Sequence, residues 1–160
     1  MLFRSVFTNP RLAHFALIYF LIQTSGYGVA FYLPTIVGAL LGKKVGLEVG
    51  LVTAIPWACA ILAGLFWPAL AVKTGFRRSF ACASLSLIGI GLILAGHLPP
   101  QWAIAALCLV TVGIITSQPI FWTFPTAYFG GVGAAAGIAA INAVGNVGGF
   151  VSSNAKTWME

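Results

Sequence analysis

The stretch SFACASLSLIGIGLILAGHLPPQWAIAALCLVTVGIITSQPIFWTF, residues 79–124, decides the fold. It opens a run of 77 residues without Lys, Arg, Asp or Glu, which ends before Lys156. A helix that crosses a bilayer needs about 20 apolar residues, so this run is too long for two spans and fits three. The segment HLPPQ at 97–101 breaks it, because prolines lack a backbone donor and disfavour a helix before them. Pro125 and the glycines after it mark a second break. We therefore predict spans at about 79–96, 102–124 and 134–151.

Two more charge-free stretches precede this run. Residues 12–42 are 31 residues without a fixed charge, and residues 49–72 are another 24. They predict spans at about 15–33, with Pro34 near its end, and at about 50–72. A Lys or Arg at the centre of a spanning helix costs about 2.5–3.5 kcal/mol, so the charged residues should lie at or outside the membrane faces. The expected fold is an all-α, polytopic membrane helical bundle of about five transmembrane helices.

The composition of the whole chain excludes several classes of protein. Of its 160 residues, 60% are hydrophobic and 6% are charged, and the mean hydropathy is +1.02. A soluble domain carries about 25% charged residues, which excludes a soluble globular protein and a disordered one. The formal net charge is +6, but the eight cations are scattered and form no stripe for a phosphate backbone. We expect no nucleic-acid partner, and the bilayer is the expected surroundings.

The distribution of the cations predicts the orientation. With the N-terminus inside, five cations fall on the cytoplasmic side (Arg4, Arg11, Lys73, Arg77 and Arg78) and three outside (Lys43, Lys44 and Lys156). Cytoplasmic loops carry an excess of Lys and Arg. The sequence therefore predicts an integral membrane protein with a cytoplasmic N-terminus.

No residue pattern in the spans supports catalysis. The predicted spans contain no Asp or Glu, and no catalytic triad, metal-ligand cluster or phosphate-binding loop can be assembled from the sequence. His14 and His97 lie at predicted span ends, where a histidine is usually a polar cap. We therefore expect a protein that is not an enzyme and that has no cofactor and no metal site.

Three of the spans present uncharged polar and aromatic residues at helical spacing. The first carries Tyr19, Gln23 and Tyr27, the fourth Thr111, Gln118 and Trp122, and the fifth Asn142 and Asn146. Residues spaced in this way share one helix face, and two carboxamides near the middle of a bilayer cost free energy unless they meet a polar group. For any one residue, packing between helices by hydrogen bonds is an equal alternative. For the set, a shared cavity is the better hypothesis, with Tyr27, Gln118, Trp122, Asn142 and Asn146 as the candidate solute-binding residues.

The fifth span also carries a ladder of small residues. Gly133, Gly137, Gly145 and Gly149 follow a spacing of four, with Ile141 in the missing position. Glycines on one face allow a neighbouring helix to approach closely. We interpret the ladder as a packing surface.

Several motifs resemble those of a known transporter superfamily. Residues 72–78, VKTGFRR, are similar to the D-R-x-G-x-R-R loop of the major facilitator superfamily, although Val72 stands where that loop has an acidic residue and Pro68 where a glycine is usual. Three stretches resemble the C-terminal half of its anion:cation symporters, which include tartrate, phthalate and sugar-acid permeases. These are GYGVAFYLPT at 26–35, FWTFPTAYF at 121–129 and AAAGIAAINAVGNVGGFVS at 134–152.

The resemblance implies a fold and a site. It implies that the five spans correspond to the seventh to eleventh helices of a twelve-helix transporter whose N-terminal half is absent from the chain. It also implies a bacterial inner membrane, an inside N-terminus, and solute contacts from Trp122 and Asn142. Coupling to protons in this family depends on acidic residues of the N-terminal half.

Two functional hypotheses follow. The first is transport of a small organic anion, a carboxylate or sugar acid, by a proton- or cation-coupled symporter that works by alternating access. Its partners would be the solute, the coupling proton or cation, and the missing N-terminal half. The alternative is a truncated, non-transporting membrane fragment or an assembly partner. Five spans and the absent acidic residues favour this alternative for the chain by itself.

Overall fold

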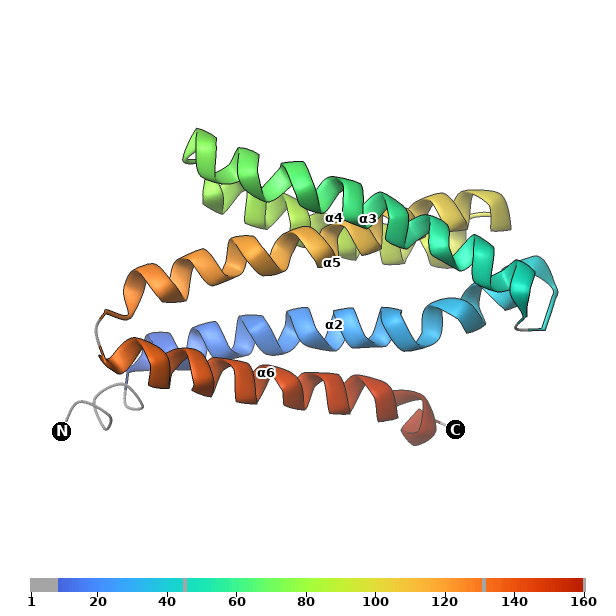
Figure 1. Ribbon diagram of the computed structural model, residues 1–160. Helices are drawn as coiled ribbons and strands as arrows, with labels where there is room; N and C mark the ends of the chain where they lie inside the picture. Colours follow the sequence, from blue (N-terminus) through green and yellow to red (C-terminus); the bar gives the residue numbers. More distant parts are fainter. Residues whose placement is uncertain (1–8, 45, 131, 160) are drawn as a thin grey trace. The chain divides into compact units, whose positions relative to one another are not determined.

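The computed structural model describes residues 9–44, 46–130 and 132–159, and in these residues the chain forms five long helices (Figure 1). They are α2 (Pro10–Leu41), α3 (Leu47–Thr74), α4 (Arg77–His97), α5 (Pro100–Tyr128) and α6 (Val132–Met159). Each is long and apolar enough to cross a membrane. The predicted fold class, an all-α bundle with five transmembrane helices, is confirmed.

The helices extend beyond the predicted spans, most of all at the ends of α2 and α6. The helix that we expected to end at about residue 151 continues to Met159, and prolines account for the differences at the ends of α2 and α5. The helix that we expected to end near Pro34 continues to Leu41, and the helix that we expected to end before Pro125 continues to Tyr128. A proline inside a helix removes only one backbone donor, and spanning helices tolerate it because their surroundings can satisfy the freed carbonyl. The breaks come instead at glycine-containing turns.

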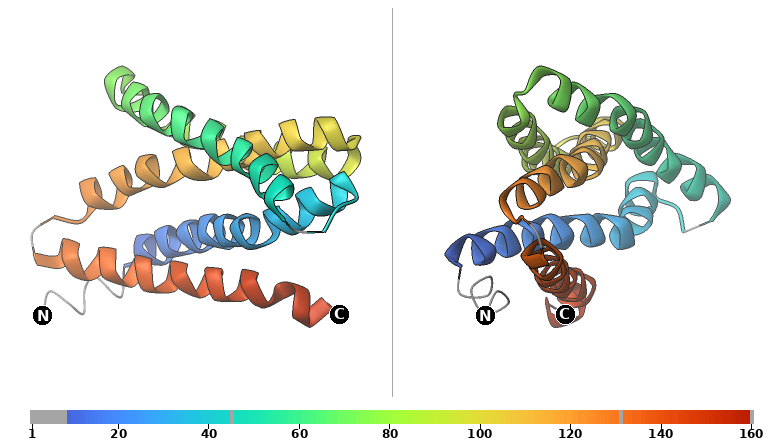
Figure 2. Two further views of the ribbon diagram at one scale, coloured as in Figure 1. Left: turned by 45° about the vertical axis from the view of Figure 1, so that its right-hand side comes forward. Right: turned by 60° about the vertical axis from the view of Figure 1, so that its left-hand side comes forward.

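Local signals define the helix ends. Pro10 and Pro100 occupy first helical positions, where the missing N–H has no helical acceptor in any case. The Asn9 side-chain oxygen accepts the backbone N–H of Arg11 at 2.9 Å and caps the start of α2. Gly75 ends α3 in the left-handed region, with φ 77°, which allows the sharp reversal into α4 (Figure 2).

The chain divides into two compact units, and the boundaries fall inside α2 and α5. Unit 1 comprises residues 1–28 and 121–160, and unit 2 comprises residues 29–120. Unit 1 therefore contains the first part of α2, the last part of α5 and all of α6. Unit 2 contains the rest of α2 and α5 together with α3 and α4.

Unit 2 packs around branched aliphatic side chains with hydroxyl groups between them. Its buried cluster consists of Val29, Leu33, Val37, Val49, Ile88, Leu107, Val110 and Ile114. The hydroxyl of Thr111 donates to the carbonyl of Pro56 at 2.7 Å and so joins α5 to α3. Ser84 accepts hydrogen bonds from Thr116 at 2.9 Å and from the Trp67 indole at 3.1 Å. This group joins α3, α4 and α5 through buried polar atoms.

Unit 1 packs through aromatic rings and glycines. Its buried cluster consists of Leu12, Ala16, Tyr19, Ile22, Phe121, Phe129 and Ile141. A Cβ atom at Gly145 would overlap the ring of Tyr19, and one at Gly149 would lie 2.6 Å from the ring of Tyr27. The predicted role of the glycine ladder in close packing is confirmed at these two positions, where α6 lies against α2 (Figure 1). The side chain of Ile141 is fully buried in the same unit.

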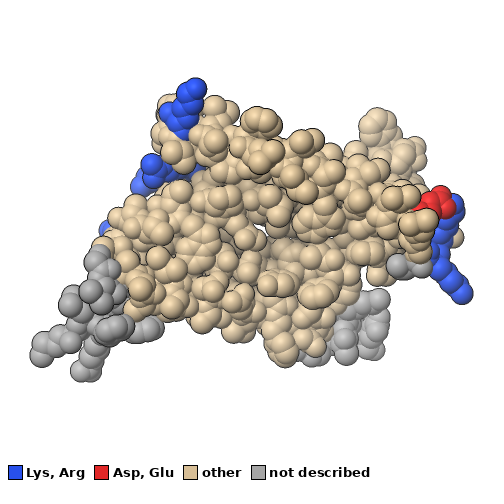
Figure 3. Space-filling model, in the orientation of Figure 1, with Lys and Arg blue, Asp and Glu red and all other residues tan. Residues whose placement is uncertain are grey.

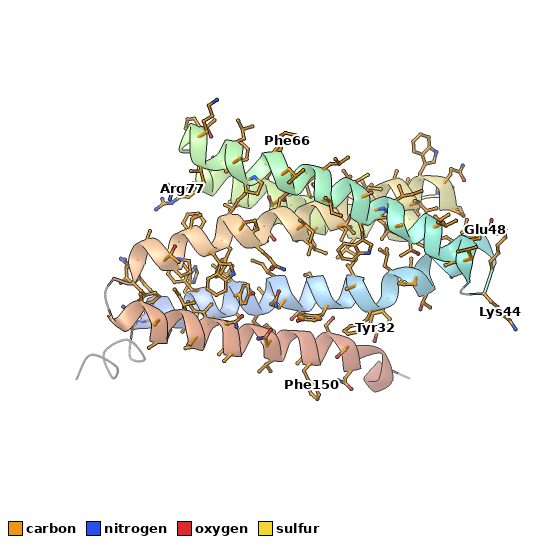
Figure 4. The ribbon with its side chains drawn as sticks, viewed as in Figure 1. Tyr32, Lys44, Glu48, Phe66, Arg77 and Phe150 are labelled. Atoms are coloured by element: carbon orange, nitrogen blue, oxygen red, sulfur yellow. The ribbon has the colours of Figure 1, made fainter. Side chains whose placement is uncertain are left out.

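The outer surface of the helices is apolar, and the charges lie at helix ends. Phe66 on α3 and Phe150 on α6 point outward, with 72% and 63% of their side chains exposed (Figure 4). In unit 2 the cations gather near the two ends of α3 and leave the surface between them uncharged (Figure 3). Apolar flanks with charged ends are what the hydrocarbon layer and its two polar faces require.

Candidate functional site

The candidate site in unit 1 begins with two asparagines on α6. Asn142 and Asn146 are one helical turn apart and both are exposed. They lie on either side of the middle of the apolar segment Ala134–Ala155. A carboxamide that faced hydrocarbon at this depth would lose its hydrogen bonds to water. The face that carries them must therefore meet water or another protein surface.

Gln23 joins the first part of α2 to this face. Only 7% of its side chain is exposed, and its Nε2 donates to the Oδ1 of Asn146 at 3.5 Å. The sequence placed Gln23 on a polar face of the first span, but we did not include it among the candidate solute-binding residues. The spacing of Tyr19, Gln23 and Tyr27 was the signal that indicated it.

Trp122 is held at the edge of the aromatic cluster. Its ring meets Tyr19 edge to face, with centroids 4.8 Å apart, and Phe121 in the same way at 5.4 Å. Tyr19 in turn stacks on Phe121 at 5.2 Å. Such pairs fix ring orientation as well as burying area. The half-buried Trp122 is therefore a preoriented side chain.

Tyr27 lies against the backbone of α6 and is 40% exposed. Its ring occupies the space that a side chain at Gly149 would need. Four of the five predicted residues, Tyr27, Trp122, Asn142 and Asn146, thus belong to unit 1. Gln118 belongs to unit 2, where it is half-buried. The binding role of all five residues stays a prediction.

The charged side chain that the structure describes in unit 1 lies at a helix end. Among the side chains that the structure describes there, the cation is Arg11, at the start of α2. Its guanidinium lies 4.7 Å from the centroid of the Tyr128 ring, and Asn9 donates to the Tyr128 hydroxyl at 3.3 Å. The described residues contain no cluster of three His, Cys, Asp or Glu that could hold a metal ion. The described residues of this face carry amide groups and aromatic rings but no fixed charge.

Five helices that are long and apolar enough to cross a membrane define a polytopic membrane protein. The family description "Major Facilitator Superfamily" matches residues 1–153, and the chain belongs to this family. The family resemblance identified from the sequence motifs is thereby confirmed.

Individual relatives of the chain are named as transporters. The chain is 47% identical to "Inner membrane transport protein RhmT" of Escherichia coli over 144 residues, which are 90% of this chain and 34% of that protein. It is 35% identical to a "Putative tartrate transporter" of Agrobacterium vitis, over 94% of this chain and 34% of the relative. It is 34% identical to "Quinolone resistance transporter" of Acinetobacter baumannii, over 89% and 33%. The chain thus spans about a third of the length of these relatives. No solved structure matches it significantly.

Proposed function

We propose that this chain forms part of a secondary transporter for a small organic anion, a carboxylate or sugar acid, coupled to a proton or another cation. The sequence motifs resemble the C-terminal half of anion:cation symporters, and one relative is named for tartrate. The helices would then correspond to the seventh to eleventh of a twelve-helix transporter. The named relatives are a mixed set, so the solute class rests on the site as well as on the names.

The observation that supports this proposal best is the exposed pair of carboxamides in the middle of an apolar helix. The amide N–H groups of Asn142 and Asn146 can donate to the carboxylate and hydroxyl oxygens of a solute. Because Gln23 donates to the oxygen of Asn146, the amide nitrogen of Asn146 stays available to a solute acceptor. Tyr27 and Trp122 would supply aromatic walls. Secondary transporters bind solutes near the bilayer midplane, between their repeats.

The remaining chemistry would come from the other half of the transporter. Residues 49–159 contain no Asp or Glu, and Glu48 lies at the end of α3 in an ion pair with Lys43, so a coupling proton has no carboxylate acceptor within the spans. Among the described residues, the face also has no cation to balance an anionic solute. Alternating access would expose the face first to one side of the membrane and then to the other.

A direct uptake experiment tests the proposal. The natural gene product that contains these 160 residues is reconstituted into liposomes, and counterflow of radiolabelled tartrate and gluconate is measured at several pH values. We expect saturable counterflow of at least one acid by a full-length transporter, and none by the 160-residue chain, whose polar face lacks its partner. Counterflow by the 160-residue chain would contradict the need for a second half. Absence of organic-acid counterflow from a folded full-length protein would contradict the solute class.

The alternative function is that of a non-transporting membrane fragment or assembly partner. The observation that favours it is that the described residues of the polar face include no cation and no acid. If the chain assembles with a separately expressed six-helix half, the two should co-purify from membranes and restore counterflow together. Co-purification without counterflow would favour an assembly partner over a transporter half.

The proposed orientation has its own test. We expect single cysteines introduced at position 74 to be shielded from impermeant maleimide in intact cells, and those at position 44 to react, in a cysteine-free background. Labelling at position 74 from outside would reverse the orientation that the five-to-three cation count predicts.

A further inference from the structure

The turn between α3 and α4 concentrates positive charge without a counter-charge. Lys73, Arg77 and Arg78 lie within six residues, and Lys73 and Arg78 are exposed while Arg77 is half-buried. The sequence has no Asp or Glu from Val49 to Met159, and the one carboxylate of α3, Glu48, lies at the opposite end of that helix in an ion pair with Lys43. The three cations at the turn therefore have no acidic partner on α3 or α4.

The shape of the turn directs these cations toward the membrane face. Gly75, with φ 77°, reverses the chain so that the end of α3 and the start of α4 lie together. Arg77 extends outward beyond the start of α4 (Figure 4). Between the cations, 68% of the Phe76 side chain is exposed. Cationic heads at the headgroup level beside an aromatic ring are typical of a membrane interface.

The opposite end of unit 2 provides an internal contrast. There, Lys43 forms an ion pair with Glu48, its Nζ lying 2.6 Å from both carboxylate oxygens. Lys43, Lys44 and Glu48 together sum to +1, whereas Lys73, Arg77 and Arg78 sum to +3. The two ends therefore differ in charge although both lie at the ends of the same helix.

We propose that the α3–α4 turn is a docking site for the headgroup of an anionic phospholipid. The two guanidinium groups and the Lys73 ammonium would donate hydrogen bonds to the lipid phosphate. Phe76 would lie among the glycerol and upper acyl groups of the same lipid. This site is separate from the solute-binding face and does not depend on the proposed transport function.

The experiment uses the natural gene product that contains this chain, purified in a mild detergent with its membrane lipids removed. Native mass spectrometry counts the phosphatidylglycerol and phosphatidylcholine molecules that bind from equimolar mixtures. A Lys or Arg near an anionic lipid surface is worth about fivefold in binding. We expect the unmodified protein to prefer phosphatidylglycerol by about tenfold or more, and expect the preference to shrink as ammonium acetate is raised.

Matched variants locate the site. The triple variant Lys73→Gln, Arg77→Gln, Arg78→Gln should lose most of the preference, and the control Lys43→Gln, Lys44→Gln should keep it. If the triple variant does not yield folded protein, Arg78→Gln alone should lower the preference about fivefold, and Arg78→Lys should largely restore it. The proposal is wrong if the unmodified protein shows no preference. It is equally wrong if the control pair loses as much preference as the variants at the turn.

Discussion

Unit 2 joins its helices through aliphatic side chains and fully buried hydroxyls, whereas unit 1 joins them through aromatic rings seated on glycines and leaves two carboxamides exposed. In unit 2, Ser84, Thr111 and Thr116 have no exposed surface, and each hydroxyl bonds to protein atoms. In unit 1, Asn142 and Asn146 are exposed in the middle of an apolar helix. Polar groups that are fully used inside a unit hold it together, and polar groups left on its surface are available for binding.

The largest expected effects come from filling the close approaches between helices. A Cβ at Gly113 in unit 2 would lie 2.5 Å from the Ser84 carbonyl oxygen, while one at Gly145 in unit 1 would overlap the ring of Tyr19. Gly113→Leu and Gly145→Leu should both sharply reduce the folded protein in the membrane. Overpacking costs about 1–3 kcal/mol and occasionally more.

The alanine variants of the same glycines separate the two kinds of packing. Gly113→Ala should lower the melting temperature more than Gly145→Ala, because the backbone of α4 cannot give way, whereas the Tyr19 side chain can shift at the expense of its contacts with Phe121 and Trp122. Gly89→Ala is the control, since nothing lies within 4 Å of a Cβ there. The measurement is thermal unfolding in detergent. Helix propensity alone should make Gly89→Ala neutral or slightly stabilising. A loss at Gly89 equal to the losses at Gly113 and Gly145 would therefore contradict close packing as their cause.

The next largest effect should fall on solute affinity. In a full-length protein, Asn142→Ala should raise the dissociation constant by roughly ten- to a hundredfold, because a hydrogen bond to a charged group is worth about 1.5–3 kcal/mol. Because Asn142 is exposed, the melting temperature of the Asn142→Ala protein should change little. Calorimetry and thermal unfolding on the same preparation measure both quantities.

A second asparagine on α6 supplies the control for this prediction. Asn154 lies near the end of α6, where its Nδ2 donates to the carbonyl of Phe150 at 2.9 Å. Asn154→Ala should leave affinity unchanged. Normal affinity in well-folded Asn142→Ala protein would remove Asn142 from the site and assign it to packing between helices.

The sequence predicts the number of helices well and their ends less well. Charges must lie at the membrane faces, so the gaps between them located two helices and a run long enough for three. The prolines at 99 and 100 correctly divided the first two helices of that run, because α4 ends at His97 and α5 begins at Pro100. The predicted helix ends at Pro34 and Pro125 were wrong, because a spanning helix tolerates the loss of one backbone hydrogen-bond donor. Gly42 and Gly75, with positive φ, lie directly after the ends of α2 and α3 and mark these two ends better than the prolines do.

Contacts between helices were only partly predictable. The spacing of four found Gly145 and Gly149, but not Gly148, where a Cβ would lie 2.5 Å from the carbonyl oxygen of Phe20. Helical spacing likewise put Gln23 and Asn146 on polar faces without showing that these two side chains meet. Spacing within one helix defines its faces, whereas the register between two helices depends on how their surfaces fit.

Removing a buried hydroxyl of unit 2 should have a smaller effect, and it should lower the stability of the protein without changing its affinity for solute. Thr116→Val removes the donor to Ser84 and keeps the shape of the side chain. Hydrogen bonds between membrane helices average about 0.6 kcal/mol, so the free energy of unfolding should fall by about 0.5–1.5 kcal/mol. A double-mutant cycle with Ser84→Ala isolates the contact. A change in solute affinity without a change in stability would contradict the contrast between the units.

The smallest effect is expected at the exposed ion pair between Lys43 and Glu48, whose side chains are 51% and 65% exposed. Exposed pairs contribute about 0.2–1 kcal/mol, so Lys43→Gln should destabilise less than Thr116→Val. Glu48→Gln should cost slightly more, because Glu48 also lies in the first turn of α3, where a negative charge meets the positive end of the helix dipole. Both losses should shrink between 0.05 and 0.5 M NaCl as the charges are screened, and Lys44→Gln is the matched control. A loss at Lys43 that exceeds the loss at Thr116 and persists in high salt would show that this turn, and not the buried hydroxyl group, holds unit 2 together.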